Sequence, residues 1–131
     1  MTYVAPFAFL KQRNKINAAT DIDHVILSYR DFLDVLRSLL RGVPVDENWY
    51  LREYPDVDEV VRAGIFKSAK HHFVQNGYFE GRRPDYCEVY EHWYLLTYPD
   101  VSSAIDAKLL ASATEHFHLS GYEEGRLPRE F

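Results

Sequence analysis

The sequence predicts an all-α protein in which a long N-terminal helix precedes two tandem three-helix repeats. Two observations lead to this prediction. Residues 45–84 align without a gap with residues 89–128, at a spacing of 44, and 20 of the 40 aligned residues are identical. Before the repeats, apolar residues follow the three- and four-residue spacing of a helix. A period of this length is typical of helical units that stack on one another.

The composition limits the class of protein. The chain has 131 residues, enough for one compact domain, and 47% of them are hydrophobic, which excludes intrinsic disorder. The net charge is −5 and no run of Lys or Arg forms a stripe, so we expect no nucleic acid partner. The single cysteine, Cys87, excludes an internal disulfide. It lies in the linker between the repeats, which offers no obvious cleft for an activated nucleophile, and this indicates a structural role.

The N-terminus places its apolar stretch before its cations, the reverse of a secretory signal. No apolar run approaches the roughly 18 residues that a membrane span needs. We therefore expect a soluble cytoplasmic protein without a membrane span.

Residues 1–20 are predicted to form an N-terminal arm and residues 21–42 an amphipathic helix. Thr20 or Asp21 would cap this helix, and Gly42 and Pro44 would stop it. Its apolar stripe consists of Ile22, Val25, Tyr29, Phe32, Leu36 and Leu39.

More than half of the circumference of this helix is apolar, because Leu27 and Val35 lie off the stripe. Two interpretations stay open. Either the helix wraps the repeats as their central core helix, or part of its surface pairs with a second chain and makes a homodimer. In the second case the contact residues would be Tyr29, Phe32 and Leu36.

Each repeat (residues 45–84 and 89–128) divides into three short helices. In the first copy, the first helix ends before Pro55, and the second begins at Pro-Asp, where Asp56 and Glu59 match a capping box. The third begins at Ser68 and ends at Gly77, where we expect a left-handed residue. The second copy repeats this pattern, with Ser103 in place of Glu59.

Residues kept in both copies are best explained by a shared fold. We expect each arginine to fold back on an acid or on exposed carbonyls of the second helix, and each histidine to tie the third helix to a neighbouring backbone or carboxylate. The members of this repeat signature are Trp49, Pro55, Asp56, His72, Gly77, Glu80, Arg82, Trp93, Pro99, Asp100, His116, Gly121, Glu124 and Arg126.

Chemical alternatives are weaker. His72 and Glu80 would be metal ligands, but no HExxH, paired-cysteine or facial-triad spacing is present. The paired acids would serve as general acid and base, but an enzyme seldom needs the same pair twice in a small domain. No P-loop, dinucleotide fingerprint or nucleophile elbow occurs. The sequence therefore predicts no enzyme, no metal and no cofactor.

The shared pattern Trp-Tyr-Leu…Tyr-Pro-Asp-Val…His-Phe…Gly-Tyr-x-Glu-Gly-Arg-x-Pro resembles a bacterial tandem-repeat module. That module accompanies glycosyltransferases and rhamnan-synthesis-type proteins of surface-polysaccharide pathways. The resemblance covers residues 45–128 and leaves residues 1–44 outside. It implies a small helical accessory module, and it carries over no catalytic or sugar-binding residue.

Three hypotheses for function follow. The leading one is a non-catalytic protein-interaction or scaffolding module, an accessory or regulator of surface-polysaccharide biosynthesis. A partner would be selected by residues that differ between the copies, with Phe79 as an anchor because the second copy has Glu123 there; Phe79 would equally fit against the N-terminal helix. These residues are Arg52, Arg62, Lys67, Lys70, Phe79 and Arg83.

The second hypothesis is a carbohydrate- or small-ligand-binding module, in which Trp49, Tyr50, Trp93 and Tyr94 line an open groove and stack on sugar rings. The third is a small enzyme. It requires a polar pocket that unites His71, His72 or His116 with carboxylates and shifts a pKa strongly.

Overall fold

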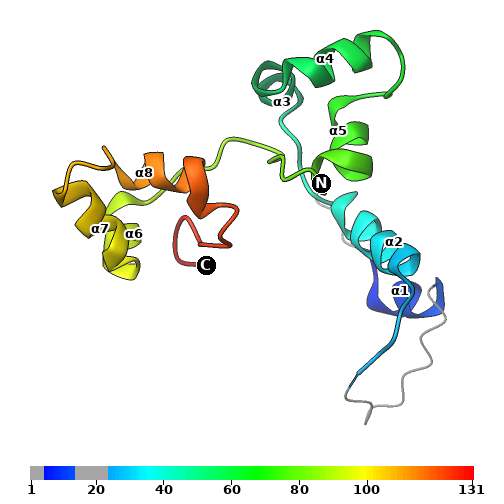
Figure 1. Ribbon diagram of the computed structural model, residues 1–131. Helices are drawn as coiled ribbons and strands as arrows, with labels where there is room; N and C mark the ends of the chain where they lie inside the picture. Colours follow the sequence, from blue (N-terminus) through cyan, green and yellow to red (C-terminus); the bar gives the residue numbers. More distant parts are fainter. Residues whose placement is uncertain (1–4, 14–23) are drawn as a thin grey trace. The chain divides into compact units, whose positions relative to one another are not determined.

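The computed structural model describes residues 5–13 and 24–131, and within these ranges every regular element is a helix (Figure 1). The predicted all-α class is confirmed. The length of the chain led us to expect one compact domain. The structure instead divides into two compact units, Met1–Asp85 and Tyr86–Phe131. The division has a physical cause, because each unit packs a hydrophobic cluster of its own.

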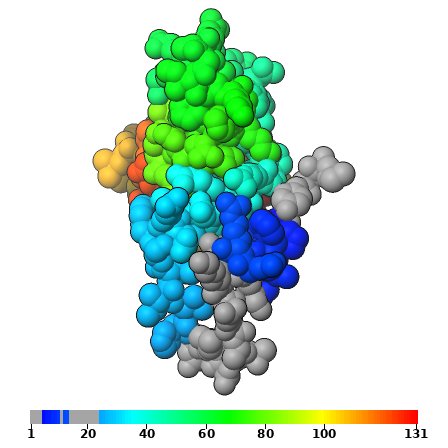
Figure 2. Space-filling model, turned by 90° about the vertical axis from the view of Figure 1, so that its right-hand side faces the viewer, coloured from blue at the N-terminus to red at the C-terminus, as the bar shows by residue number. Residues whose placement is uncertain are grey.

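The N-terminal part holds two helices, α1 (Phe7–Arg13) and α2 (Tyr29–Leu40), which lie side by side (Figures 1 and 2). The prediction of a helix from Asp21 is wrong at its start. Residues 24–28 are not helical, and the cap is Ser28, whose hydroxyl accepts the backbone N–H of Asp31 at 3.1 Å. The other predicted cap, Thr20, and Asp21 itself lie outside the described residues.

In the first unit, α3 (Glu47–Glu53) and α4 (Pro55–Arg62) form a helical hairpin. It is followed by α5 (Ala69–His72), which continues directly into the π-helical turn η1 (Phe73–Gly77). As predicted, Pro55 separates the first two helices and Ser68 caps the third, accepting the N–H of His71 at 3.0 Å. The buried core consists of Leu40, Tyr50, Val57, Ala69, Phe73 and Val74.

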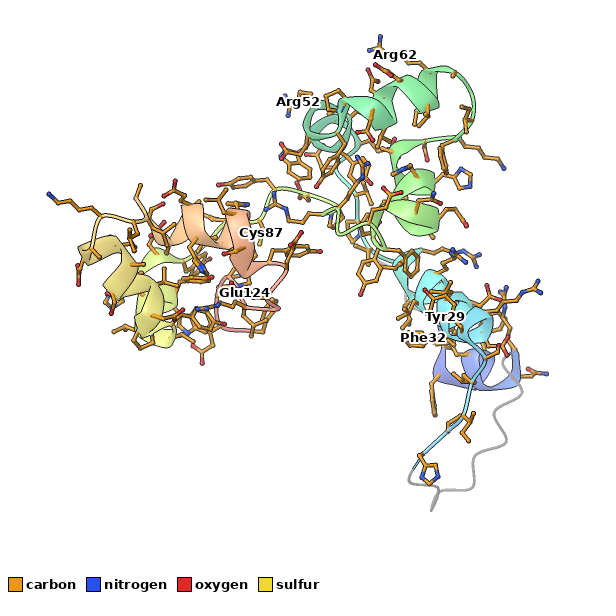
Figure 3. The ribbon with its side chains drawn as sticks, in the orientation of Figure 1. Tyr29, Phe32, Arg52, Arg62, Cys87 and Glu124 are labelled. Carbon is orange, nitrogen blue, oxygen red and sulfur yellow. The ribbon has the colours of Figure 1, made fainter. Side chains whose placement is uncertain are left out.

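The second unit has the same order of elements. α6 (Glu91–Thr97) and α7 (Pro99–Asp106) are followed by α8 (Ala113–His116) and the π-helical turn η2 (Phe117–Gly121). Cys87, labelled in Figure 3, is partly buried against the core of this unit, which agrees with a structural role. That core consists of Val89, Tyr94, Val101, Ala113 and Phe117.

In each repeat, a glutamate on the first helix (α3 or α6) holds the start of the third helix (α5 or α8). The Glu91 carboxylate accepts the backbone N–H groups of Ala113 at 2.9 Å and Thr114 at 2.8 Å. Glu47 makes the corresponding contacts in the first unit, at 3.3 and 3.4 Å. Burial alone would raise the pKa of Glu91, but the hydrogen bonds from Thr114 and Ala113 lower it. This contact stabilises a helix that is too short to persist alone.

Two backbone predictions need correction. Gly77 and Gly121 are not left-handed ends of the third helix, because they lie within η1 and η2. The left-handed residues come four positions later, at Gly81 with φ 78° and Gly125 with φ 73°. The reason is the π-helical turn, in which Tyr78 N–H reaches back to the carbonyl of Phe73 at 3.0 Å and so continues the coil past Gly77.

The helix α2 belongs to the first unit. Its C-terminal end packs on the first unit, where Leu40 is buried in the core and Arg37 reaches the carbonyl of Gln75 at 3.2 Å. Much of its remaining apolar surface faces solvent. Among the helices that the structure describes, none is long and apolar enough to cross a membrane.

Candidate functional site

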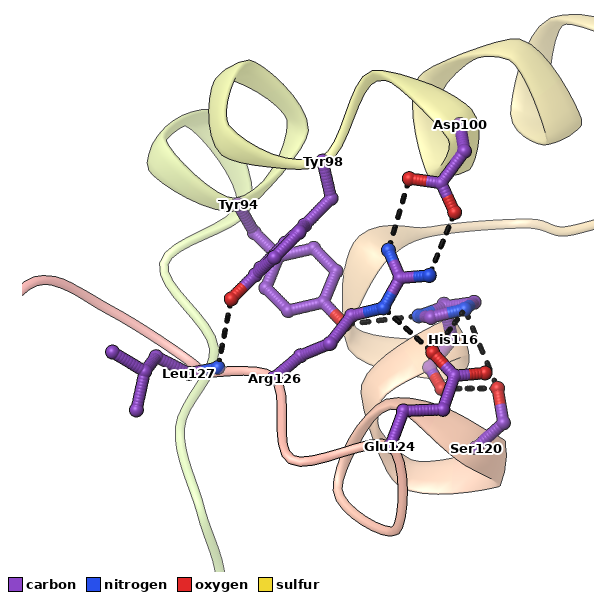
Figure 4. Close-up of polar contacts among 8 residues, drawn as sticks. All are labelled: Tyr94, Tyr98, Asp100, His116, Ser120, Glu124, Arg126 and Leu127. Atoms are coloured by element: carbon purple, nitrogen blue, oxygen red, sulfur yellow. Dashed lines mark hydrogen bonds and ion pairs between the residues drawn. The ribbon is translucent and has the colours of Figure 1, made fainter.

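The repeated residues assemble one polar cluster in each unit, built around a buried tyrosine. Tyr50 on α3 is 0% exposed, and its hydroxyl shares a hydrogen bond of 3.0 Å with Nδ1 of His72 at the end of α5. Tyr94 and His116 repeat this bond at 2.9 Å in the second unit (Figure 4). The histidines therefore do tie the third helix to a neighbour. The hydrogen-bond partner is a tyrosine hydroxyl, which was not expected, and the carboxylate of Glu80 lies at ion-pair distance, 3.9 Å from Nε2 of His72.

Only glycine leaves enough space beside the tyrosine–histidine hydrogen bond. A Cβ atom at Gly77 would overlap the hydroxyl oxygen of Tyr50 and come within 3.2 Å of His72 Nδ1. A Cβ at Gly121 would overlap the hydroxyl of Tyr94 in the same way. The two glycines of the signature therefore make room for the tyrosine hydroxyls.

Arginine clamps the outer side of each cluster. Arg82 donates from both Nη atoms to the Asp56 carboxylate, at 2.8 and 2.6 Å, and from Nε to Glu80 at 2.8 Å. Its guanidinium also lies over the ring of Tyr54, 4.9 Å from the centroid. The predicted fold-back of the arginine on an acid of the second helix is confirmed. Arg126 repeats the arrangement with Asp100 and Glu124 (Figure 4).

This clamp also explains why Asp56 is not a helix cap. The residue before α4 is Tyr54, which makes no side-chain cap bond, and Pro55 occupies the first turn. The predicted capping box of Asp56 and Glu59 is therefore wrong, because the Asp56 carboxylate is engaged by Arg82. The hydrogen bond from Arg82 holds the pKa of Asp56 below its usual range.

The cluster offers little acid–base chemistry. Burial raises the pKa of Tyr50 and also that of Tyr94, the latter to about 12, so both phenols stay protonated at neutral pH. Burial lowers the pKa of His72. Tyr50 is fully enclosed and His72 is 5% exposed, so neither presents a reactive atom to a substrate. Among the described residues, no group of three or more His, Cys, Asp or Glu side chains is placed to hold a metal ion.

The aromatic groove of the carbohydrate hypothesis is not present as predicted. Tyr50 and Tyr94 are fully buried in the two cores. Trp49 and Trp93 are half-buried, and each packs edge-on against the tyrosine that precedes the proline, with ring centroids 6.0 and 6.2 Å apart. These rings support the helical hairpin of each unit.

The candidate interaction surface is the apolar face of α2. We define this α2 face as Tyr29, Phe32, Leu36 and Leu39. Tyr29 is 75% and Phe32 48% exposed (both labelled in Figure 3), Leu39 is 37% exposed, and Leu36 is half-buried. Val25 and Ile26, just before the helix, are 50% and 92% exposed and extend the apolar surface. An exposed set of large apolar side chains on neighbouring positions is typical of a protein contact surface.

Phe79 adjoins the α2 face. Together with Tyr29 and Arg37 it lines a shallow groove of about 270 Å³ between α2 and η1. Phe79 remains 38% exposed, with the Arg37 guanidinium 5.1 Å from its ring centroid. The structure thus brings together two of the four predicted contact residues, Tyr29 and Phe79. The sequence signal for this site was that Phe79 has no aromatic counterpart in the second copy.

The other copy-specific residues lie apart from this groove. Arg52 on α3 and Arg62 on α4, both labelled in Figure 3, line a separate open hollow, and Arg62 pairs with Asp58 at 2.9 Å. Such a pair, one helical turn apart on the surface, is an ordinary feature of exposed helices.

Compared with known protein families, curated proteins and solved structures, the chain matches none of them.

Proposed function

We propose that this protein is a non-catalytic protein-interaction module, made of two copies of one three-helix unit, which binds its partner through the α2 face. The observation that carries the proposal is the exposure of Tyr29 and Phe32 on a helix that is anchored at its other end. Leu40 and Arg37 hold α2 on the first unit, so the exposed side chains stand on a fixed support. A fixed apolar surface loses little conformational entropy when a partner covers it.

We propose a second copy of the chain as this partner. A two-fold dimer needs one surface that matches itself, and the α2 face fits this requirement because its apolar positions span the whole helix. The backbone dipole of α2 leaves partial positive charge at its N-terminal end and partial negative charge at its C-terminal end. An antiparallel pair therefore brings ends of opposite charge together, and a parallel pair does not.

In the proposed function, the repeated polar clusters have a structural role. The tyrosine and histidine of each cluster bond to each other and the arginine bonds to two carboxylates, so these side chains stabilise the units and leave recognition to the surface. The resemblance to modules that accompany polysaccharide enzymes supports a scaffolding role beside such an enzyme, with the partner surface used for assembly.

Light scattering across a range of protein concentrations tests the proposal. We expect a mass approaching twice the 15.4 kDa of one chain, and we expect Phe32→Lys to return the protein to the mass of a single chain. The control is Leu96→Lys, which places the same charge on a side chain that is 69% exposed on α6, and which should leave the mass unchanged. A wild-type protein that keeps the mass of one chain throughout would refute the proposed dimer, as would a Phe32→Lys variant that still dimerises.

A further inference from the structure

The first unit shows how a helix binds the outer side of the π-helical turn. The helix α2 lies against η1, where Arg37 donates to the carbonyl of Gln75 and stacks over Phe79. Gln75, Asn76 and Phe79 line the groove at this junction. We call these three positions the helix seat of the first unit.

The second unit keeps this seat without the helix. The positions 44 residues later are Leu119, Ser120 and Glu123. Residues 86–131 are described throughout, and the segment that precedes α6 there is not helical. Leu119 is 69% exposed and Glu123 is exposed as well. The seat on η2 therefore presents an apolar side chain and a carboxylate that no helix of its own unit covers.

The charge of the second unit indicates what would bind there. Residues 86–131 contain eight acidic and three basic side chains, which accounts for the whole net charge of −5, while residues 1–85 contain twelve of each. Where Arg37 of α2 meets the ring of Phe79, an arginine at the same position on η2 would meet the carboxylate of Glu123. Arginine and carboxylate form a strong charge-assisted hydrogen bond.

We propose that the helix seat of the second unit, Leu119, Ser120 and Glu123, binds an arginine-bearing amphipathic helix from another protein chain. The arginine donates to Glu123 and to the carbonyl of Leu119, as Arg37 does to Gln75, and the apolar side chains of that helix cover Leu119. This site is separate from the α2 face and is a second contact surface beyond the proposed function.

A labelled peptide with the sequence of residues 28–42 is the probe, because it has the chemistry of a helix known to fit the seat of the first unit. Fluorescence anisotropy measures its binding to the full chain. We expect saturable binding that weakens at least tenfold with Glu123→Lys and with Leu119→Asp. The matched control is Asp106→Lys, the same charge change on α7, which should alter the affinity less than twofold.

Charge exchange distinguishes this site from the α2 face. A peptide with Arg37→Glu should lose affinity for the wild-type chain and regain it for the Glu123→Lys chain. Every chain in these titrations also carries Phe32→Lys, which removes pairing of the peptide with the α2 face, so the remaining binding reports on the seat alone and a failed dimer and a failed seat give different results. Absence of saturable binding, or equal affinity for the Glu123→Lys and wild-type chains, would overturn the proposal. A near-native far-UV circular dichroism spectrum would show that the variants are folded.

Discussion

Replacing Gly77 by alanine tests the physical role of the repeated glycine. The new Cβ would overlap the Tyr50 hydroxyl, so the tyrosine must move and its bond with His72 is lost. Overpacking a core costs about 1–3 kcal/mol, and leaving the buried bonding groups unsatisfied costs about 1–3 kcal/mol more. Alanine regains about 1 kcal/mol of helix propensity over glycine. We expect the free energy of unfolding of the first unit to fall by about 3 kcal/mol.

The measurement is urea unfolding followed by tryptophan fluorescence. Each unit contains one tryptophan, Trp49 or Trp93, so the variant in a Trp93→Phe background reports on the first unit alone. Gly64→Ala is the control within the same unit. Its backbone is left-handed, with φ 76°, but a Cβ there meets no atom within 4 Å, so we expect a cost of only about 1–2 kcal/mol from the backbone.

A double-mutant cycle decides whether the Tyr50 hydroxyl is the cause. Tyr50→Phe removes the oxygen that the new Cβ would meet, so Gly77→Ala should cost less than about 1 kcal/mol in that background. If the two substitutions are additive, the steric argument fails and the glycine serves the backbone instead.

Three further predictions follow from the cluster and the caps. Asp56→Asn should cost at most about 1 kcal/mol in the same urea assay, since its carboxylate is largely exposed, and a loss above about 2 kcal/mol would contradict the surface position of the clamp. Burial lowers the pKa of His72 in the folded state, so the unfolded chain binds the proton first and the first unit should lose stability as the pH falls below about 6.5; His72→Gln should reduce this slope, and an unchanged slope would assign it to other groups. Ser68→Ala should cost about 1 kcal/mol by removing the cap of α5, and an unchanged urea midpoint would show that Glu47 alone suffices to hold the helix start.

The sequence was sufficient where the signal was local or repeated. Proline at the start of a helix and serine at its cap act on the backbone within a few residues of themselves, so the breaks at Pro55 and Ser68 could be predicted. The fold-back of Arg82 on the second helix could also be predicted, because the two copies keep both charges at the same separation, but the choice of Asp56 over exposed carbonyls could not. The all-α class followed from the periodicity.

Contacts between distant residues could not be predicted in the same way. The hydroxyl of Tyr50 is buried with its ring, and nothing in its own helix identifies His72 as its partner. Gly77 follows the last residues of a helical pattern, where a left-handed cap is the usual reason for glycine; its actual reason is a tyrosine 27 positions earlier. The start of α2 was placed too early because the apolar spacing continues through Val25, where the backbone is no longer helical.

Positions that are identical in the two copies and positions that differ between them lie in different parts of the repeat. Tyr50, His72 and Gly77 are identical in the two copies and face inward, where one changed atom disturbs a buried bond. Gln75 and Phe79, on the same turn, differ in the second copy and face outward, where a change alters only what can bind. Duplication alone would have preserved both kinds equally. The contrast between Phe79 and Glu123 therefore indicates that the two units present different surfaces on one scaffold, one suited to a helix of this chain and the other to an arginine-bearing helix from another chain.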